Sequence, residues 1–135
     1  MSENEGVPAK TAEAGLPTIL VVASDQTLLK LVKMALQLEF PCEVLSFERG
    51  LNALETARHV IPALVIIHFY LFDLHALELA DRLHNMQGCE SVPILLTHMP
   101  FAFWNMALRS YLTVLTLPFQ LETFYAAVQT CLDRT

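Results

Sequence analysis

Five short, mostly apolar runs alternate along the chain with longer segments in which apolar residues recur every three or four positions. One run, Ala63-Leu-Val-Ile-Ile-His68, is uninterrupted and rich in β-branched residues, which is typical of a strand buried on both faces of a sheet. The runs predict five strands, and they cover residues 18–23, 43–47, 63–69, 93–97 and 112–117.

The segments between the runs have the spacing of amphipathic helices. In the first of them Leu29, Val32 and Leu36 fall on one face. Ser24 or Asp25 can cap its first turn through a side-chain oxygen. The predicted helices cover residues 26–40, 53–60, 74–86, 101–109 and 121–132, the second of them after a turn at Gly50 and Asn52.

Strands that alternate with single helices pair in parallel through right-handed crossovers, with helices on both faces. Five such strands predict a flavodoxin-like, doubly wound α/β fold with the strand order 2-1-3-4-5. We assign this domain to residues 17–135, and the polar, aperiodic residues 1–16 predict a disordered tail. In this fold the carboxyl ends of the first and third strands form a crevice. The residues at the crevice are Ala23, Ser24, Asp25 and His68, with Thr97 and His98 beside them.

Composition and charge exclude several classes of protein. The net charge of −6 argues against direct binding to nucleic acid, which requires a basic surface. No apolar run approaches the roughly 20 residues of a membrane span. Because the amino terminus also lacks the regions of a signal peptide, we expect a cytoplasmic protein without membrane contact. Three widely spaced cysteines form no Cys-x-x-Cys pair, so neither a zinc site nor a disulfide framework is indicated.

Glycine is scarce where nucleotide-binding folds need it. The predicted domain has only Gly50 and Gly88, and it contains no Gly-x-Gly-x-x-Gly or Gly-x-x-x-x-Gly-Lys-Ser/Thr sequence. A backbone without glycine in its first turn wraps a phosphate poorly, so no nucleotide cofactor is expected. A Gly-x-Ser-x-Gly nucleophile elbow is also missing, which argues against acyl transfer.

Several short sequence segments within residues 18–132 resemble the receiver (CheY-like) domain of two-component response regulators. Thr-Ile-Leu-Val-Val, starting at Thr18, resembles its first strand, and Pro-Ala-Leu-Val-Ile-Ile with the following Phe-Tyr-Leu-Phe-Asp-Leu resembles its third strand and loop. Pro-Ile-Leu-Leu-Thr97 resembles the fourth strand, and Leu-Thr-Leu-Pro-Phe119 resembles the end of the fifth. The resemblance implies a CheY-like fold and a role in two-component signal transduction or a phosphorelay.

The positions that carry phosphorylation in receivers depart from the family pattern. Mg²⁺ needs several hard oxygen ligands, and an aspartyl phosphate needs a carboxylate nucleophile. Against the family pattern, Ala23 and Ser24 replace the acidic pair, with Asp25 one residue further on, His68 replaces the acceptor aspartate, Leu117 replaces the lysine, and Thr97 retains the switch hydroxyl. We therefore predict a pseudo-receiver that needs no phosphorylation, metal or cofactor and is not an enzyme.

His68 leaves several interpretations open. It can accept a phosphoryl group on its own nitrogen, or bind a transition metal with His98, Asp25 or Ser24. It can also fill the acceptor space while hydrogen-bonded to a nearby hydroxyl or to the backbone, or act as a pH-sensitive latch. The alternative function is a small-ligand or metal sensor that uses the crevice at the carboxyl ends of the first, third and fourth strands. Residues 73 and 75, in the loop beyond His68, are expected to be solvated.

An aromatic-rich segment, Pro100-Phe-Ala-Phe-Trp-Asn-Met-Ala-Leu108, precedes the fifth strand. Neighbouring residues of a helix face different directions, so its three large rings cannot all point inward unless the short loop folds them into the core. An exposed aromatic patch marks an interface, and the resemblance implies that the fourth helix, fifth strand and fifth helix form the face that binds partners. We predict contact with a protein partner, or with a second copy in a homodimer, through Phe101, Phe103, Trp104, Tyr111, Val114 and Tyr125.

Overall fold

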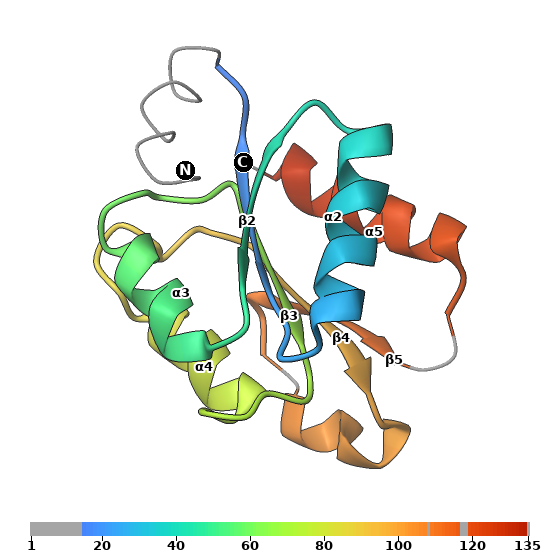
Figure 1. Ribbon diagram of the computed structural model, residues 1–135. Helices are drawn as coiled ribbons and strands as arrows, with labels where there is room; N and C mark the ends of the chain where they lie inside the picture. Colours follow the sequence, from blue (N-terminus) through green and yellow to red (C-terminus); the bar gives the residue numbers. More distant parts are fainter. Residues whose placement is uncertain (1–14, 108, 117–118, 135) are drawn as a thin grey trace.

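A single parallel sheet organises the chain. The computed structural model describes residues 15–107, 109–116 and 119–134. The sheet has the order β2-β1-β3-β4-β5, which confirms the predicted flavodoxin-like topology (Figure 1). Its strands are β1 (Thr18–Val22), β2 (Glu43–Phe47), β3 (Leu64–His68), β4 (Ile94–Met99) and β5 (Leu112–Thr116).

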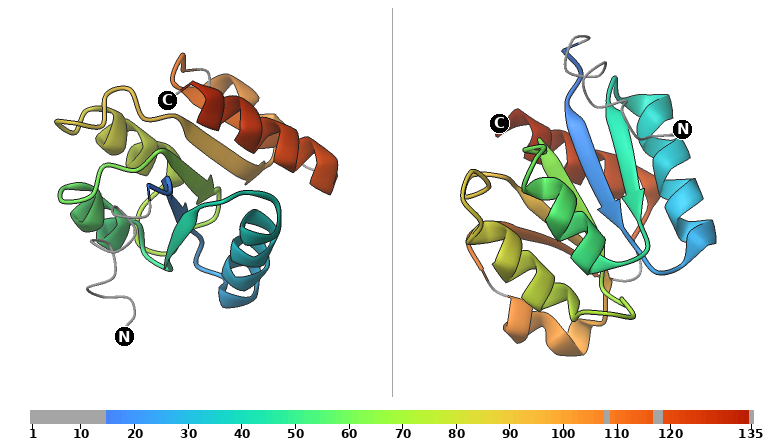
Figure 2. Two further views of the ribbon diagram at one scale, coloured as in Figure 1. Left: turned by 90° about the horizontal axis from the view of Figure 1, so that it is seen from above. Right: turned by 60° about the vertical axis from the view of Figure 1, so that its left-hand side comes forward.

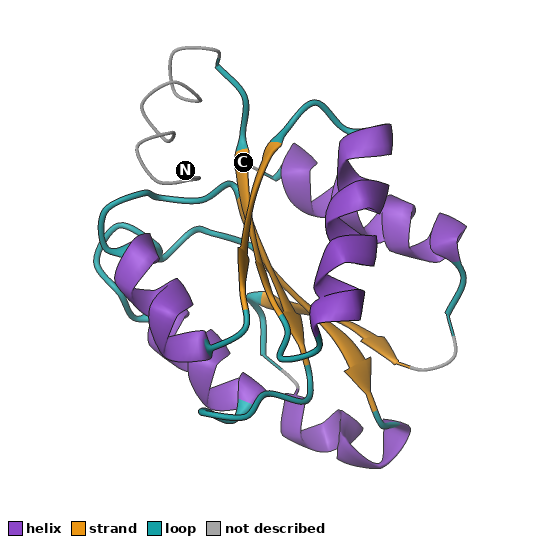
Figure 3. Cartoon of the chain, viewed as in Figure 1, coloured by secondary structure: helices purple, strands orange, loops and turns teal. Residues whose placement is uncertain are grey.

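The helices cover both faces of the sheet. Helices α2 (Gln26–Glu39) and α5 (Leu121–Asp133) pack on one face, and α3 (Gly50–Ala57) and α4 (Ala76–His84) pack on the other (Figure 2). Figure 3 shows the short helix η1 (Phe101–Ala107) beyond the carboxyl end of β4. None of the helices described is long and apolar enough to cross a membrane.

The core has two halves, one on each side of the sheet. Along β3, Val65 and Ile67 pack in the half beneath α3 and α4, while Leu64 and Ile66 pack in the half beneath α2 and α5. All four side chains are buried, which explains why the run is apolar without alternation. The three cysteines are also buried as free thiols, as the sequence predicts.

Helix α3 begins earlier than the sequence indicates. The pattern predicts a turn at Gly50 and Asn52, whereas the helix starts at Gly50. The carboxylate of Asp73 accepts hydrogen bonds from the backbone N–H groups of Gly50 (2.9 Å) and Leu51 (3.0 Å), which satisfies two free donors of the first turn. A Cβ atom at Gly50 would lie 3.2 Å from Leu79 Cδ2, so glycine suits this close approach.

The aromatic segment also differs from its prediction. It forms a 3-10 helix that ends at Ala107, not an α-helix reaching residue 109. Its first turn closes through a 3.0 Å hydrogen bond from the backbone N–H of Phe103 to the carbonyl of Pro100. Most 3-10 helices are shorter than these seven residues, although 3-10 turns frequently serve as connectors. The predicted tail, apart from residues 15 and 16, and Leu117 lie outside the described residues.

Candidate functional site

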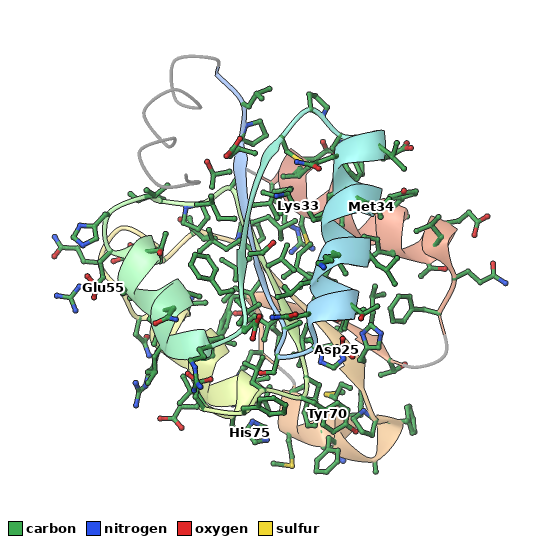
Figure 4. The ribbon with its side chains drawn as sticks, in the orientation of Figure 1. Asp25, Lys33, Met34, Glu55, Tyr70 and His75 are labelled. Atoms are coloured by element: carbon green, nitrogen blue, oxygen red, sulfur yellow. The ribbon has the colours of Figure 1, made fainter. Side chains whose placement is uncertain are left out.

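The carboxyl ends of β1, β3 and β4 bring most of the predicted crevice residues together. Ala23, Ser24 and Asp25 follow β1, which pairs with β3, and His68 at the end of β3 pairs with Thr97 of β4. Figure 4 shows Asp25 at the start of α2, at the same end of the sheet as Tyr70. The sequence pattern therefore places these residues correctly at one edge of the sheet.

The residues after β1 use their oxygen atoms within the chain. Ala23 is buried and has no polar side-chain atom. The hydroxyl of Ser24 donates to the carbonyl of Glu48 (2.8 Å) and accepts from the backbone N–H of Phe72 (3.0 Å). The carboxylate of Asp25 accepts from the backbone N–H of Leu28 (3.1 Å) and caps α2, one of the two alternatives that the sequence offers. These contacts fix the ends of three strands and the start of a helix.

His68 is held by the backbone that follows it. Its Nδ1 lies 3.3 Å from both the carbonyl oxygen and the backbone nitrogen of Tyr70. The sequence left open whether this ring bonds to a nearby hydroxyl or to the backbone, and in the structure it bonds to the backbone. Burial lowers the pKa of His68, opposed by the carbonyl of Tyr70 and the charge of Asp25. The surroundings therefore favour the neutral form of the ring.

His98 has an unusual backbone beside His68. The pairing of β4 with β5 shifts register between Thr97 and Met99, so His98 is the extra residue of a bulge. Among the described residues it is the only one other than glycine with a positive φ, of 65°. Its Nδ1 lies 3.0 Å from the hydroxyl oxygen of Thr97, and its ring centroid lies 4.5 Å from that of His68. Burial, followed by the proximity of His68, lowers the pKa of His98.

The crevice lacks the donor set of a metal centre. Within the described residues, no three His, Cys, Asp or Glu side chains lie close enough together to hold a metal ion. His68 and His98 supply two imidazoles, whereas zinc sites in proteins use at least three protein ligands. The residue that ends β3 in the crevice is His68, which has no carboxylate.

Two residues of the loop after β3 cap helices, a role that the sequence prediction missed. Asp73 caps α3, and the Nδ1 atom of His75 accepts from the backbone N–H of Leu77 and caps α4. Burial disfavours the charge on Asp73, but the donors of Leu51 and Gly50 outweigh it and lower the pKa of the carboxyl group. The sequence prediction placed His75 inside a helix over residues 74–86, whereas the structure places it as the N-cap of α4 (Ala76–His84).

A cluster of exposed aromatic and apolar side chains lies at the carboxyl edge of the sheet. Its side chains come from the loop after β3 and from η1. The ring of Phe69 contacts both segments, with its centroid 5.0 Å from that of Tyr70 and 5.3 Å from that of Phe103. Phe72 is 85% exposed, Phe101 73% and Trp104 40%. The sequence prediction included the three rings of η1 but missed the contribution of the loop after β3. We call this surface the aromatic edge, and it consists of Tyr70, Phe72, Phe101, Phe103, Trp104 and Met106.

The remaining interface candidates make contacts within the chain. Tyr111 stacks on His84 with ring centroids 4.0 Å apart, and its hydroxyl donates to the carboxylate of Asp81. The hydroxyl of Tyr125 donates to the carbonyl of Ala35 (3.0 Å) and so joins α5 to α2. Val114 is half-buried against the core beneath α3 and α4.

Neither the family models nor the curated proteins include a match to this chain. Solved structures do match it. A CheY-like response regulator receiver domain protein from Methanospirillum hungatei JF-1 has a TM-score of 0.77 and 18% identity, over 87% of this chain and 94% of that one. The signal receiver domain of an HD domain-containing protein from Pseudomonas fluorescens Pf-5 has a TM-score of 0.75 and 23% identity, over 87% and 88%.

A third match warns against reading function from the fold. A structure of adenylate cyclase from Rhodopirellula baltica has a TM-score of 0.77 and 19% identity, over 88% of this chain and 89% of that one. One fold carries many functions, and identities at this level establish the fold alone. The chain therefore has the fold of a CheY-like receiver domain, and its function must be argued from its own residues.

Proposed function

We propose that residues 17–135 form a receiver-like signalling module that acts by protein–protein contact and needs no phosphorylation. The observation that carries the proposal is His68, which ends β3 where a receiver would have its acceptor aspartate and whose Nδ1 lies at hydrogen-bond distance from the backbone of Tyr70. The proposal includes a role in two-component signal transduction, which the CheY-like fold and the resemblance of the sequence support, and a location in the cytoplasm.

The chemistry of the crevice supports a module that is not an enzyme. Phosphoryl transfer requires a nucleophile together with a metal or cation that neutralises charge on the transferred group. At the acidic-pair positions the chain has Ala23 and Ser24, and at the lysine position it has Leu117. The hydroxyl of Ser24 and one carboxylate oxygen of Asp25 are already bonded within the chain. Transfer to the nitrogen of His68 would lack the same metal and cation.

The aromatic edge supports contact with another protein. Aromatic and methionine side chains are enriched in interfaces, and contiguous exposed apolar patches mark sites of interaction. The segment 98–108 contains no Asp, Glu, Lys or Arg. An uncharged surface can meet its own copy without repulsion even though each chain carries a net charge of −6. We therefore include a homodimer, formed through η1 and the adjoining β5 and α5, in the proposal.

The alternative is a sensor that binds a small ligand or metal in the crevice at the ends of β1, β3 and β4. It has less support, because Ser24, Asp25 and His68 each have a hydrogen-bond partner within the chain. The two histidines alone are too few for a metal centre.

The test of phosphorylation independence is intact mass after incubation with acetyl phosphate and Mg²⁺. We expect an unchanged mass for the native chain and for His68→Asp, since the variant restores the carboxylate but not the metal ligands or the cation. A receiver domain with a complete acceptor site, treated in parallel, shows that the donor is active. A stoichiometric phosphoryl adduct on the native chain would overturn the proposal.

A further inference from the structure

A pocket opens between α2 and α5, on the face of the sheet away from α3 and α4. Its volume is about 250 Å³. The two helices lie on the same face of the sheet in both Figure 1 and Figure 2. Buried Ile66 and Phe124 belong to its wall, and the exposed side chains of Leu31 and Leu121 also line it. The wall is therefore apolar from the core outward to the surface.

Among the described residues, the only polar side chains in the wall are those of Thr97 and His98, both from β4. None of the described residues that line the pocket is Asp, Glu, Lys or Arg. Within the described residues, the Thr97 hydroxyl and Nδ1 of His98 are paired with each other, while Nε2 of His98 has no hydrogen bond. A concave apolar wall with one convergent polar group is the usual composition of a small-molecule site.

The backbone of His98 is specialised for this position. The bulge at Thr97 and Met99 removes His98 from the regular pairing of β4, and bulges commonly redirect a side chain beside a functional site. Its φ of 65° is unfavourable for a residue with a side chain, and such outliers persist only where surrounding contacts hold them. Here the rings of His68, at 4.5 Å, and Phe119, at 5.2 Å, flank the imidazole.

From this geometry we propose that the pocket binds a small, uncharged, largely apolar molecule, of the size of one or two fused rings, that hydrogen-bonds to His98. The lining excludes phosphates and carboxylates, since it offers them no cation. It also excludes metal ions, since it offers a single imidazole. The site shares His98 with the crevice, but it lies between the helices and does not use Ser24 or Asp25. The lowered pKa of His98 favours the neutral ring, and in the tautomer whose Nδ1–H donates to the Thr97 hydroxyl oxygen, Nε2 can accept a hydrogen bond.

The experiment is a titration of the ¹⁵N-labelled full chain with indole, followed by amide chemical shifts. Indole has an apolar bicycle and one N–H donor, and indene is its counterpart without the donor. We expect saturable shifts at the amides of Val32, Ala35, His98 and Phe124. We also expect indole to bind about tenfold more tightly than indene, the effect of one well-formed hydrogen bond.

Variants test the location. Ala35→Phe fills the pocket and should weaken indole binding at least about tenfold, while Ala126→Phe makes the same change on an exposed site of α5 outside the pocket and should leave binding within about twofold. Leu31→Glu puts a charge among the exposed lining residues, where it does not disturb the core, and should also weaken binding about tenfold. His98→Asn, which tolerates a positive φ, should abolish the preference for indole over indene.

Three results would overturn the proposal. The first is the absence of saturable shifts in the native chain. The second is equal binding of indole by Ala35→Phe, Leu31→Glu and Ala126→Phe. The third is saturable shifts confined to the aromatic edge. The proposal does not depend on the proposed signalling function, because the titration reports on the pocket whether or not the chain is phosphorylated or dimeric.

Discussion

The imidazole rings of His68 and His98 lie 4.5 Å apart, centroid to centroid, at the ends of the neighbouring strands β3 and β4. Burial lowers the pKa of each ring, and for His98 the nearby His68 is the second cause. Asp25 is the one charged group that acts on His68 in the opposite direction. Protonating both rings would place two like charges side by side in a half-buried site, so the folded chain favours the neutral pair.

We expect the free energy of unfolding to fall as the pH drops from about 7 to about 5. In the unfolded chain both histidines titrate near 6.5, whereas in the folded chain they take up protons only at lower pH. The unfolded state therefore binds more protons in this range, and stability decreases with acidity. The contribution of the two rings to stability is complete above pH 6.5, their pKa in the unfolded chain. It is lost as the pH falls through this value towards the lowered pKa values of the folded chain. Urea unfolding at several pH values measures it.

The matched control for this prediction is His59, an exposed residue of the other face that pairs with Glu55. His68→Gln and His98→Asn should each flatten the dependence on pH, and His59→Gln should not. Equal slopes in all four proteins would contradict the neutral pair. An NMR titration of His68 without any linked structural change would in addition dispose of the latch hypothesis.

Tyr111 is the centre of a polar contact between β5 and α4. Its hydroxyl donates to Asp81, which also accepts from Nε of Arg109 (2.8 Å). Burial, followed by the hydrogen bond to Asp81, raises the pKa of Tyr111 to about 12. Because an unfolded tyrosine ionises near 10, the unfolded state loses its proton first, and stability should fall between these two values as the pH rises.

Tyr111→Phe should lower the free energy of unfolding by about 1 kcal/mol at neutral pH and remove this alkaline loss. Urea unfolding measures the first effect, and absorbance titration of the phenolate measures the second. Tyr70→Phe is the control, since that ring is 54% exposed. A Tyr111→Phe protein as stable as the native chain would show that the contact with Asp81 contributes nothing.

Asp73 should matter more for stability than its position in a loop suggests. Asp73→Ala leaves the N–H groups of Gly50 and Leu51 without their partner, and loss of a helix cap costs about 1–2 kcal/mol. Asp133→Ala removes an exposed carboxylate that accepts from the side chain of Gln129, and it should change stability by less than about 0.5 kcal/mol. Thermal or urea unfolding compares them, and similar losses in both would refute the capping role.

The sequence determines the strands and the crevice because their signals are local. The run at 63–68 is apolar on both faces because both faces of β3 are covered, and the fold rule then places His68 beside the end of β1. Asp25 caps the helix that it directly precedes. Each of these inferences needs only neighbouring residues and the period of the pattern.

What the sequence could not predict depends on contacts between distant segments. Asp73 caps a helix that begins 23 residues earlier, and Ser24 binds the backbone of residues 24 and 48 positions away. The bulge at His98 leaves no mark in the sequence, since the residue with the positive φ is not glycine. The pocket between α2 and α5 follows from how two helices pack on the sheet, which periodicity does not report.

The aromatic edge yields the prediction that bears most directly on function. We expect the native chain to dimerise through it, and Phe101→Ser to weaken the dimer by at least about tenfold, because truncating a buried interface anchor costs about 2 kcal/mol or more. Phe101 is 73% exposed in the single chain, so its loss should not unfold the domain. Leu38→Ser is the matched control, since Leu38 is 82% exposed on α2 and lies outside the aromatic edge. Light scattering during size exclusion, over a range of concentrations, measures the equilibrium.

If Leu38→Ser weakens the dimer and Phe101→Ser does not, the interface lies on α2. If all three proteins are monomers at every concentration, the homodimer is excluded, and contact through this surface must be with a different protein.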